Sequence, residues 1–264
     1  MISYVSIAVM AFDLLLGIAL PTALAIILRK KFKLGLKPFF VGCAVWIIFV
    51  MVLEKILHTV ILKSPFGAVI QGNVWYYALY GGLAAGLFEE GGRYLAMKTV
   101  LRKEHGDKRN SILYGAGHGG IEAFVILSLG MVNNLTYSIL YNTGNISLVT
   151  AFLDEGQRST FQMVLDQLAA ASPATFLAGP AERITAIIFH IALSVIVWMG
   201  VTGKRALMLP LAIFLHFTVD AVSVILSRQG IGIALTEVII FAMVVPVAWY
   251  AYRLFTKIYR ELNF

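Results

Sequence analysis

The sequence predicts an all-α, polytopic bundle of transmembrane helices that crosses the membrane seven or eight times. Of its 264 residues, 59% are hydrophobic and only 13% are charged, whereas soluble domains are about half apolar and a quarter charged. Apolar runs of about twenty residues, the length that a helix needs to cross the hydrocarbon core, recur along the chain. We therefore expect a multi-pass integral protein of the cell membrane, with a single domain over residues 1–264.

Seven apolar runs predict the spans. The first run is too long for a cleavable signal and is followed by basic residues, so we interpret it as a span. The predicted spans lie near residues 3–28, 38–62, 74–101, 111–133, 181–201, 206–227 and 232–256.

The basic residues predict the orientation of these spans. They cluster after the first, third, fifth and seventh spans, which is typical of cytoplasmic loops that face anionic lipid. The N-terminus is therefore expected outside and the C-terminus in the cytoplasm. The net charge of +7 is explained by topology, so we expect the lipid bilayer, and no nucleic acid, as a partner. The clusters are Arg29 to Lys33, Arg102 to Arg109, Lys204-Arg205, and Arg253 with Lys257 and Arg260.

The segment 134–180 has charges between apolar residues at roughly helical spacing. It could lie in the interface as an amphipathic helix, dip into the membrane as a re-entrant helix, or add an eighth span. With the predicted orientation, this segment is extracytoplasmic or interfacial.

Ionisable side chains inside the predicted spans are the candidate functional residues, because burying them in a membrane is costly. Two pairs share one helix face at i,i+4 spacing: His118 with Glu122, and His216 with Asp220. We expect Glu54 and His58, nearer the outer end of span two, to be a structural pair. The candidates on spans three to six are Glu89, Glu90, Arg93, His118, Glu122, His190, His216 and Asp220.

The depth of these candidates strengthens the prediction of one site. At about 1.5 Å per residue they fall in one slab near the middle of the membrane, within about a turn of one another. We expect one of the two glutamates and the three histidines to lie within about 10 Å of a common centre. Glycines beside Glu90 and His118 would allow close helix packing or leave room for a substrate.

The residue types limit the chemistry. The chain has no H-E-x-x-H motif, no G-x-S motif and only one cysteine, Cys43, so a helical zinc-protease motif or a serine or thiol nucleophile is not indicated. A Glu/His set could hold a divalent metal that activates water, or a glutamate could itself act as general base. For the metal we expect zinc, with His118, His190 and His216 as ligands and Glu122 as an alternative.

The adjacent glutamates are expected to differ in role. Glu89 has the better i,i+4 spacing to Arg93, so we expect it to hold the guanidinium. Glu90 is flanked by Gly91 and Gly92, so we expect it to activate water.

The motifs together resemble the superfamily that contains the type II CAAX prenyl proteases, the CPBP proteases, PrsW and YhfC. They are E-E-x-x-R at 89–93, G-x-G-H-G-G-x-E-A at 115–123, His190, and H-x-x-x-D at 216–220, and they look most like the YhfC family. The resemblance covers half the chain, about 88–220, within a motif-bearing core of 74–227. It implies an intramembrane endopeptidase that cuts a membrane protein or peptide in or near the bilayer.

Residue roles follow from the same resemblance. One of the paired glutamates would activate water, Arg93 would complete their motif, and Glu122 and Asp220 match other motif positions. Prenyl proteases have an asparagine where this chain has Asp220, so this residue is expected to orient His216 instead.

From the residues alone, a proton-coupled or metal-ion transporter and a catalytically silent scaffold remain alternatives, because midplane Glu/His/Asp groups also form ion pathways.

Overall fold

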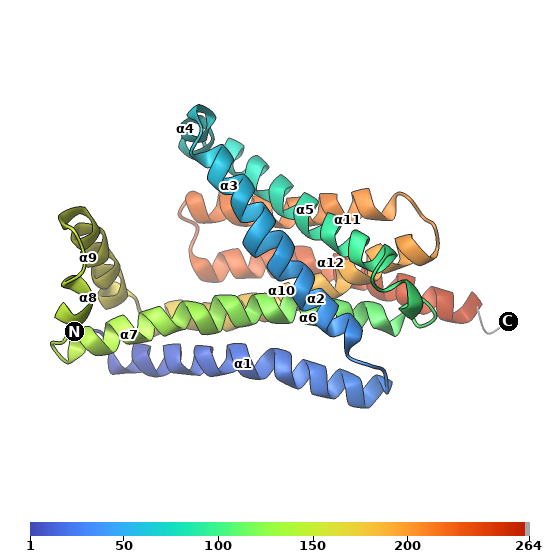
Figure 1. The fold of residues 1–264 in the computed structure, drawn as a ribbon, viewed down its shortest axis with the longest axis horizontal. Helices are drawn as coiled ribbons and strands as arrows, with labels where there is room; N and C mark the ends of the chain where they lie inside the picture. Colours follow the sequence, from blue (N-terminus) through green and yellow to red (C-terminus); the bar gives the residue numbers. More distant parts are fainter. Residues whose placement is uncertain (262–264) are drawn as a thin grey trace. The chain divides into compact units, whose positions relative to one another are not determined.

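A computed structural model describes residues 1–261 of the protein, and the side chains of residues 1–256. Every regular element in residues 1–261 is helical, which confirms the predicted all-α class. Lys257 and Arg260 of the last basic cluster lie outside the described side chains. The elements are α1 (Tyr4–Phe32), α2 (Lys37–Trp46), η1 (Ile47–Glu54), α3 (Lys55–Leu62), α4 (Pro65–Gly72), α5 (Val74–Lys98), η2 (Arg102–Glu104), α6 (Arg109–Ala123), η3 (Phe124–Leu129), α7 (Gly130–Asn142), α8 (Ser147–Thr150), α9 (Glu155–Ala170), α10 (Pro173–Thr202), α11 (Met208–Arg228) and α12 (Ile233–Glu261) (Figure 1).

Within the described residues, six helices are long and apolar enough to cross a membrane. They correspond to six of the seven predicted spans. The seventh, α5, has 25 residues but carries the two glutamates and the arginine of the E-E-x-x-R motif. Its crossing of the membrane, the total number of spans and the orientation stay predictions. The six are Tyr4–Phe32, Lys37–Leu62, Arg109–Asn142, Pro173–Thr202, Met208–Arg228 and Ile233–Thr256.

Two of these helices extend well beyond their predicted ends. The helix predicted at 111–133 covers Arg109–Asn142, and the one predicted at 181–201 covers Pro173–Thr202. Hydropathy falls toward the ends of such helices, but backbone hydrogen bonding continues. The two ends of segment 134–180, residues 134–142 and 173–180, are therefore continuations of two long helices.

The chain divides into two compact units, and the first contains Met1–Leu20 and Ala123–Glu182. Its small apolar core includes Ile2, Met10, Leu168 and Phe176. The helix expected within segment 134–180 is present as α9, which begins with a capping box at Asp154. The interfacial or re-entrant placement of this helix stays a prediction.

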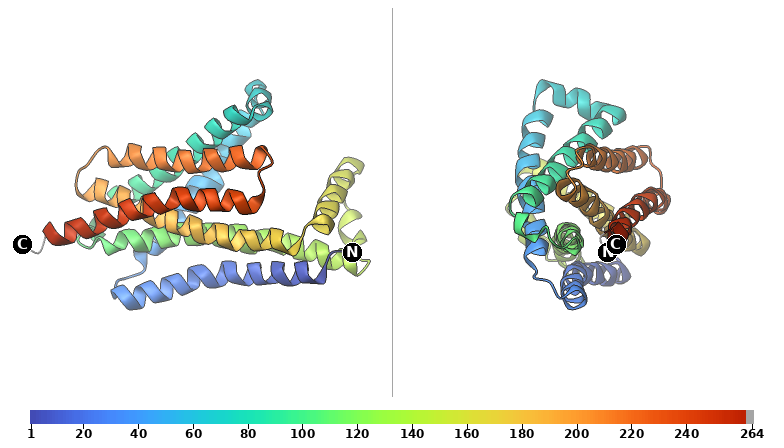
Figure 2. Two further views of the ribbon diagram at one scale, coloured as in Figure 1. Left: turned by 180° about the vertical axis from the view of Figure 1, so that it is seen from behind. Right: turned by 90° about the vertical axis from the view of Figure 1, so that its right-hand side faces the viewer.

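The second unit contains Pro21–Glu122 and the chain from Arg183 onward, and it holds all the candidate site residues. Helices α5 and α11 lie side by side in it, and α12 runs beside α11 (Figure 2). The core is built around α10 and includes the fully buried Leu193, Ile196 and Trp198. A π-helical turn, η1, interrupts the helix Lys37–Leu62 and ends at the buried Glu54. Such turns are frequent at functional sites.

Candidate metal centre

Four helices of the second unit bring the candidate residues together. The side chains predicted to share one site are confirmed as neighbours: the ring centroids of His118 and His190 are 4.8 Å apart, and those of His190 and His216 are 5.6 Å apart. All three histidines are buried. Helix α5 supplies Glu89, Glu90 and Arg93, α6 supplies His118 and Glu122, α10 supplies His190, and α11 supplies His216 and Asp220.

Glycines allow these helices to approach closely. A Cβ atom at Gly86 of α5 would lie 2.9 Å from the carbonyl oxygen of Ile213 in α11. A Cβ atom at Gly115 of α6 would lie 2.5 Å from the Cα atom of Ile191 in α10. Distances this short do not occur for real side chains, so these positions require glycine for packing. The glycines flanking His118 have the same role, because Cβ atoms there would meet the backbones of Phe39 and Ile187.

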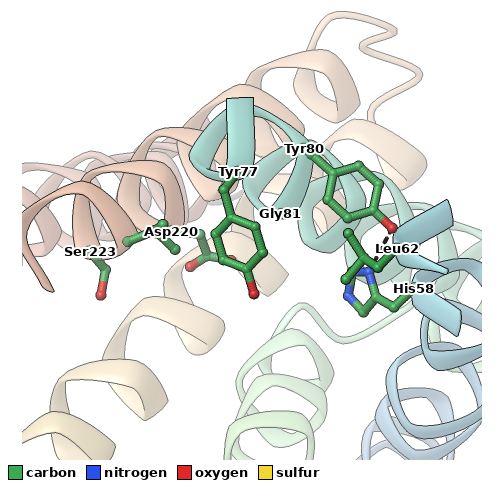
Figure 3. Close-up of a pocket in the computed structure, with 8 residues that line it drawn as sticks. His58, Leu62, Tyr77, Tyr80, Gly81, Asp220 and Ser223 are labelled. Atoms are coloured by element: carbon green, nitrogen blue, oxygen red, sulfur yellow. Dashed lines mark hydrogen bonds between the residues drawn. The ribbon is translucent and has the colours of Figure 1, made fainter. Parts of the chain in front are cut away.

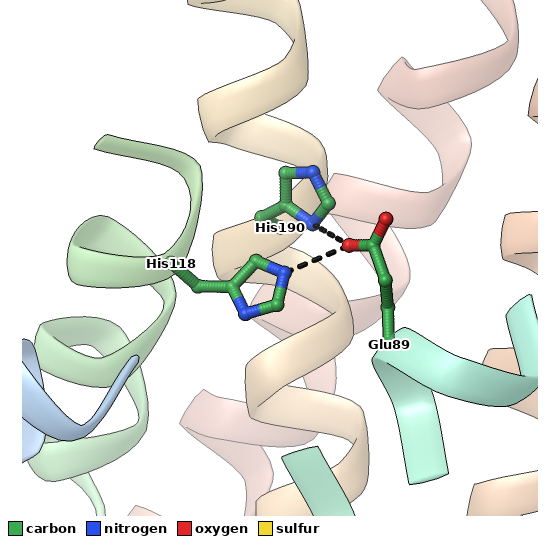
Figure 4. A group of neighbouring side chains, drawn as sticks. All are labelled: Glu89, His118 and His190. Atoms are coloured by element: carbon green, nitrogen blue, oxygen red, sulfur yellow. Dashed lines mark hydrogen bonds and ion pairs between the residues drawn. The ribbon is translucent and has the colours of Figure 1, made fainter. Parts of the chain in front are cut away.

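Glu89, His118 and His190 form the tightest group of potential metal ligands. One donor atom from each lies within 4.8 Å of the others (Figure 4). Glu89 Oε2 is 2.8 Å from His118 Nε2 and 3.9 Å from His190 Nδ1. A carboxylate and two imidazoles are a donor set that suits zinc and similar divalent ions.

The neighbours of His190 fix which of its nitrogens carries the ring proton. Nδ1 lies 3.1 Å from Nη2 of Arg93, and a guanidinium can only donate. Nδ1 is therefore the acceptor, and the ring proton is on Nε2, which is 2.6 Å from Glu122 Oε2. A carboxylate behind a histidine in this way is the usual support for a metal-binding imidazole.

Glu90 provides similar support for His216. Glu90 Oε1 is 2.8 Å from His216 Nδ1, and both carboxylate oxygens are 2.6 Å from Arg93 Nη1. An ionised carboxylate accepts hydrogen bonds, so His216 has its proton on Nδ1. His216 Nε2 then faces Glu89 Oε1 at 3.8 Å and Asp220 Oδ2 at 3.4 Å. The expected contact between Asp220 and His216 is confirmed.

The ion pair expected between Glu89 and Arg93 is wrong. Arg93 pairs with Glu90, three residues before it, and both side chains are fully buried. Spacings of three and four residues both bring side chains together on a helix. The choice is made by other helices, because His118 lies beside Glu89 and His216 lies beside Glu90.

The ligand group also differs from the expected three histidines. Glu89 occupies the position in the tightest group that we had expected for His216. Since Nε2 of His216 is within 4 Å of Glu89, this histidine stays a predicted further ligand. Glu122 lies on the opposite edge of the His190 ring from Glu89, where it supports the imidazole.

The sequence did not indicate the part that Arg183 has in the site. Arg183 is buried, and its Nη1 is 2.6 Å from Glu122 Oε1. A buried Glu122 requires a nearby cation to compensate its charge. The feature of the sequence that could have indicated this cation is an arginine within an apolar helix. The partner itself could be identified only from the tertiary structure.

A cavity of about 340 Å³ lies beside this cluster (Figure 3). Asp220 lines it and also contacts His216, so the cavity borders the buried group. Its wall includes His58, whose Nδ1 lies 2.8 Å from the hydroxyl of Tyr80. His58 Nε2 is 3.2 Å from Glu54, which confirms the expected pair.

The family model described as YhfC intramembrane metalloprotease matches residues 15–245. The chain belongs to this family. A curated relative, the uncharacterized membrane protein YhfC of Bacillus subtilis (strain 168), is 30% identical over 252 residues, which cover 95% of this chain and 96% of the relative. No solved structure matches the chain. The matched region contains every residue of the cluster, and the family and this relative identify the chain as a multi-pass membrane protein.

Proposed function

We propose that the protein is an intramembrane endopeptidase that uses Glu89 and a divalent metal, zinc by preference, to hydrolyse peptide bonds in or near the membrane. The observation that carries this proposal is the convergence of Glu89 with two buried imidazoles, whose donor atoms lie within 4.8 Å of one another. The metalloprotease name of the family supports the same chemistry.

The residues fit a metal. His190 has its proton on the nitrogen that faces Glu122, so the lone pair of its other nitrogen, Nδ1, would bind the ion in place of the hydrogen bond from Arg93 Nη2. His118 Nε2 is directed at Glu89 Oε2, and a bound ion would replace the proton between them; that proton would move to Nδ1, which has no hydrogen-bond partner among the described residues. Glu89, His118 and His190 would hold the ion, with His216 as a further ligand. When bound, such an ion polarises a carbonyl and lowers the pKa of water.

The two carboxylate oxygens of Glu89 would have different roles. Oε2 faces His118 and belongs to the ligand group, whereas Oε1 faces His216. We assign to Oε1 the acceptance of a proton from the attacking water. General-base catalysis of this kind contributes about 10²–10⁴-fold to rate. Glu90 is unsuited to this role because Arg93 and His216 occupy its carboxylate.

The remaining charged residues would hold the reacting groups in position. Arg93 fixes Glu90, which in turn orients His216. Arg183 fixes Glu122, which orients His190. The cavity beside Asp220 would admit the substrate chain.

The test compares new protein N-termini in membranes that contain the wild-type protein or Glu89→Gln. Glu104→Gln is the matched control, because Glu104 makes a surface ion pair with Lys37 outside the cluster. We expect termini that depend on the wild-type and Glu104→Gln proteins and disappear with Glu89→Gln. Identical termini in all three membranes would refute peptidase activity, and an ion flux into proteoliposomes that requires Glu89 would then favour the transporter.

A metal assay accompanies this test. Protein purified without chelator should contain about one divalent ion per chain, and His118→Ala should lose it. His105→Ala is the control, because His105 lies in the loop between α5 and α6 and contacts the carbonyl of Met97. Full peptidase activity in protein stripped of metal would contradict the metal assignment while leaving Glu89 as a general base.

A further inference from the structure

A second hollow, of about 310 Å³, lies where the end of α5 meets the turn between α10 and α11. Three cations line it: Lys98 from α5, and Lys204 and Arg205 from the turn. No carboxylate is among its lining side chains in the described part of the chain. Three like charges around one hollow repel one another, so an anion would be attracted to it.

Lys204 adopts a backbone conformation that lysine normally avoids. Its φ angle is 51°, in the left-handed region. The turn is of the Schellman type, because Arg205 N donates to the carbonyl of Gly200 at 2.9 Å. Glycine is the usual residue at the position of Lys204 in such a turn, since it has no Cβ to strain the backbone. Lys204 is exposed at this turn, so its charge is accessible at the hollow.

Part of the lining of the hollow is apolar, which favours a lipid over a free anion as the ligand. Val197, Val201 and Leu209 line it and are buried or half-buried, whereas the three cations are exposed. Tyr94 adds an aromatic ring whose hydroxyl is 3.1 Å from Lys98 Nζ. A charged rim above apolar walls, at the ends of membrane helices, fits a phosphate headgroup with its acyl chains.

From this geometry we propose that the hollow bounded by Lys98, Lys204 and Arg205 binds the phosphate of one anionic phospholipid. Zwitterionic lipids bind less well, because their own cation is repelled by the three basic side chains. The bound headgroup joins the end of α5, which carries Glu89 and Glu90, to the turn between α10 and α11. This site is independent of the proposed peptidase activity.

The test titrates full-length protein in a neutral detergent with short-chain phosphatidylglycerol, with phosphatidylcholine of the same chains, and with inorganic phosphate. Bound lipid is counted by native mass spectrometry, and the apparent dissociation constant is measured. We expect one phosphatidylglycerol per chain, binding that weakens as salt is added, and weaker binding of phosphatidylcholine. In Lys204→Gly the affinity for phosphatidylglycerol should fall about fivefold, the loss expected for one cation near a lipid surface.

The chain offers a matched control in Lys33. This exposed lysine ends α1 with a φ of 55° and a hydrogen bond from its N–H to the carbonyl of Arg29, and it is not among the residues that line the hollow. Lys33→Gly removes the same charge and the same strain, so its affinity for phosphatidylglycerol should equal that of the wild type. Both glycine variants should unfold at the same or a higher temperature than the wild type without added lipid.

Three results would overturn the proposal. One is an equal loss of affinity in Lys33→Gly and Lys204→Gly, which would indicate diffuse surface charge. Another is equal binding of phosphatidylcholine and phosphatidylglycerol. The third is binding of inorganic phosphate as tight as that of phosphatidylglycerol, which would indicate a free-anion site. Lys98→Gln provides the same fivefold test if Lys204→Gly does not fold.

Discussion

Replacing each of the adjacent glutamates by glutamine should separate a positioning role from a reactive one. Glu90 is fully buried and accepts hydrogen bonds from Arg93 Nη1 at 2.6 Å and from His216 Nδ1 at 2.8 Å. Glu90→Gln leaves the buried guanidinium without its counter-charge. Breaking a buried ion pair from one side costs about 3–5 kcal/mol of unfolding free energy. In a chain of this size that lowers the midpoint of thermal unfolding by roughly 6–20 °C.

Glu89→Gln should have the opposite profile. The contact of Glu89 that lies within hydrogen-bond distance is His118 Nε2 at 2.8 Å, and the amide oxygen of glutamine can still accept there. When both proteins are compared free of metal, the cost should be about 1 kcal/mol, that of one altered hydrogen bond. Proteolysis should fall by about 10²–10⁴-fold, because the amide cannot take a proton from water.

The assay combines thermal unfolding in detergent with counting of new N-termini in membranes, and uses Glu104→Gln as the surface control. The surface pair of Glu104 with Lys37 is worth about 0–1 kcal/mol, so this variant should be close to wild type in both measurements. A stable but inactive Glu90→Gln, together with an active Glu89→Gln, would refute the assignment of the two roles.

Four further changes should act in predictable ways. Glu122→Gln should weaken metal binding about 10–100-fold in a competition titration, because it removes the support behind His190; unchanged affinity would contradict that support. A chelator should lower the unfolding free energy by about 2.7 kcal/mol if the metal had been present at 100 times its dissociation constant, and no change in thermal unfolding would argue against a bound ion. Gly115→Ala should destabilise the protein by about 1–3 kcal/mol and reduce activity, since α6 and α10 must separate; a neutral effect would show that the close approach is unimportant. Asp154→Ala should cost about 1 kcal/mol in thermal unfolding by removing the cap of α9, and a loss of proteolysis would place α9 in the reaction.

Much of the fold could be predicted from the sequence because hydropathy and helix length are directly linked in a membrane. Six predicted spans correspond to helices that are long and apolar enough to cross. The predicted ends were less accurate for Arg109–Asn142 and Pro173–Thr202, because these helices continue beyond the point where their hydropathy declines. The predicted span at 74–101 is the α5 helix, whose charges mark the site.

The members of the cluster could also be predicted, because depth in the membrane can be counted along each helix. Which of these side chains pair with one another could not be predicted, since the pairing depends on how each helix is rotated about its axis. The rotation of α5 directs Glu89 toward His118 and leaves Glu90 to Arg93. Spacing along one helix allowed either glutamate to pair with Arg93. For the same reason, the contact of Arg183 with Glu122 was missed.

The charges of the cluster give an independent argument for a divalent ion. Each of two carboxylates is paired with its own arginine, Glu90 with Arg93 and Glu122 with Arg183. Among the four carboxylates of the cluster, Glu89 and Asp220 are the two outside these pairs, and both face His216. With all four carboxylates ionised and all three histidines neutral, the cluster would have two more negative than positive charges, and excess charge is costly where water is scarce. A divalent cation beside Glu89 would balance this excess and bind the Nδ1 lone pair of His190 in place of the hydrogen bond from Arg93. The ligand geometry and the charge balance thus indicate the same position for the ion.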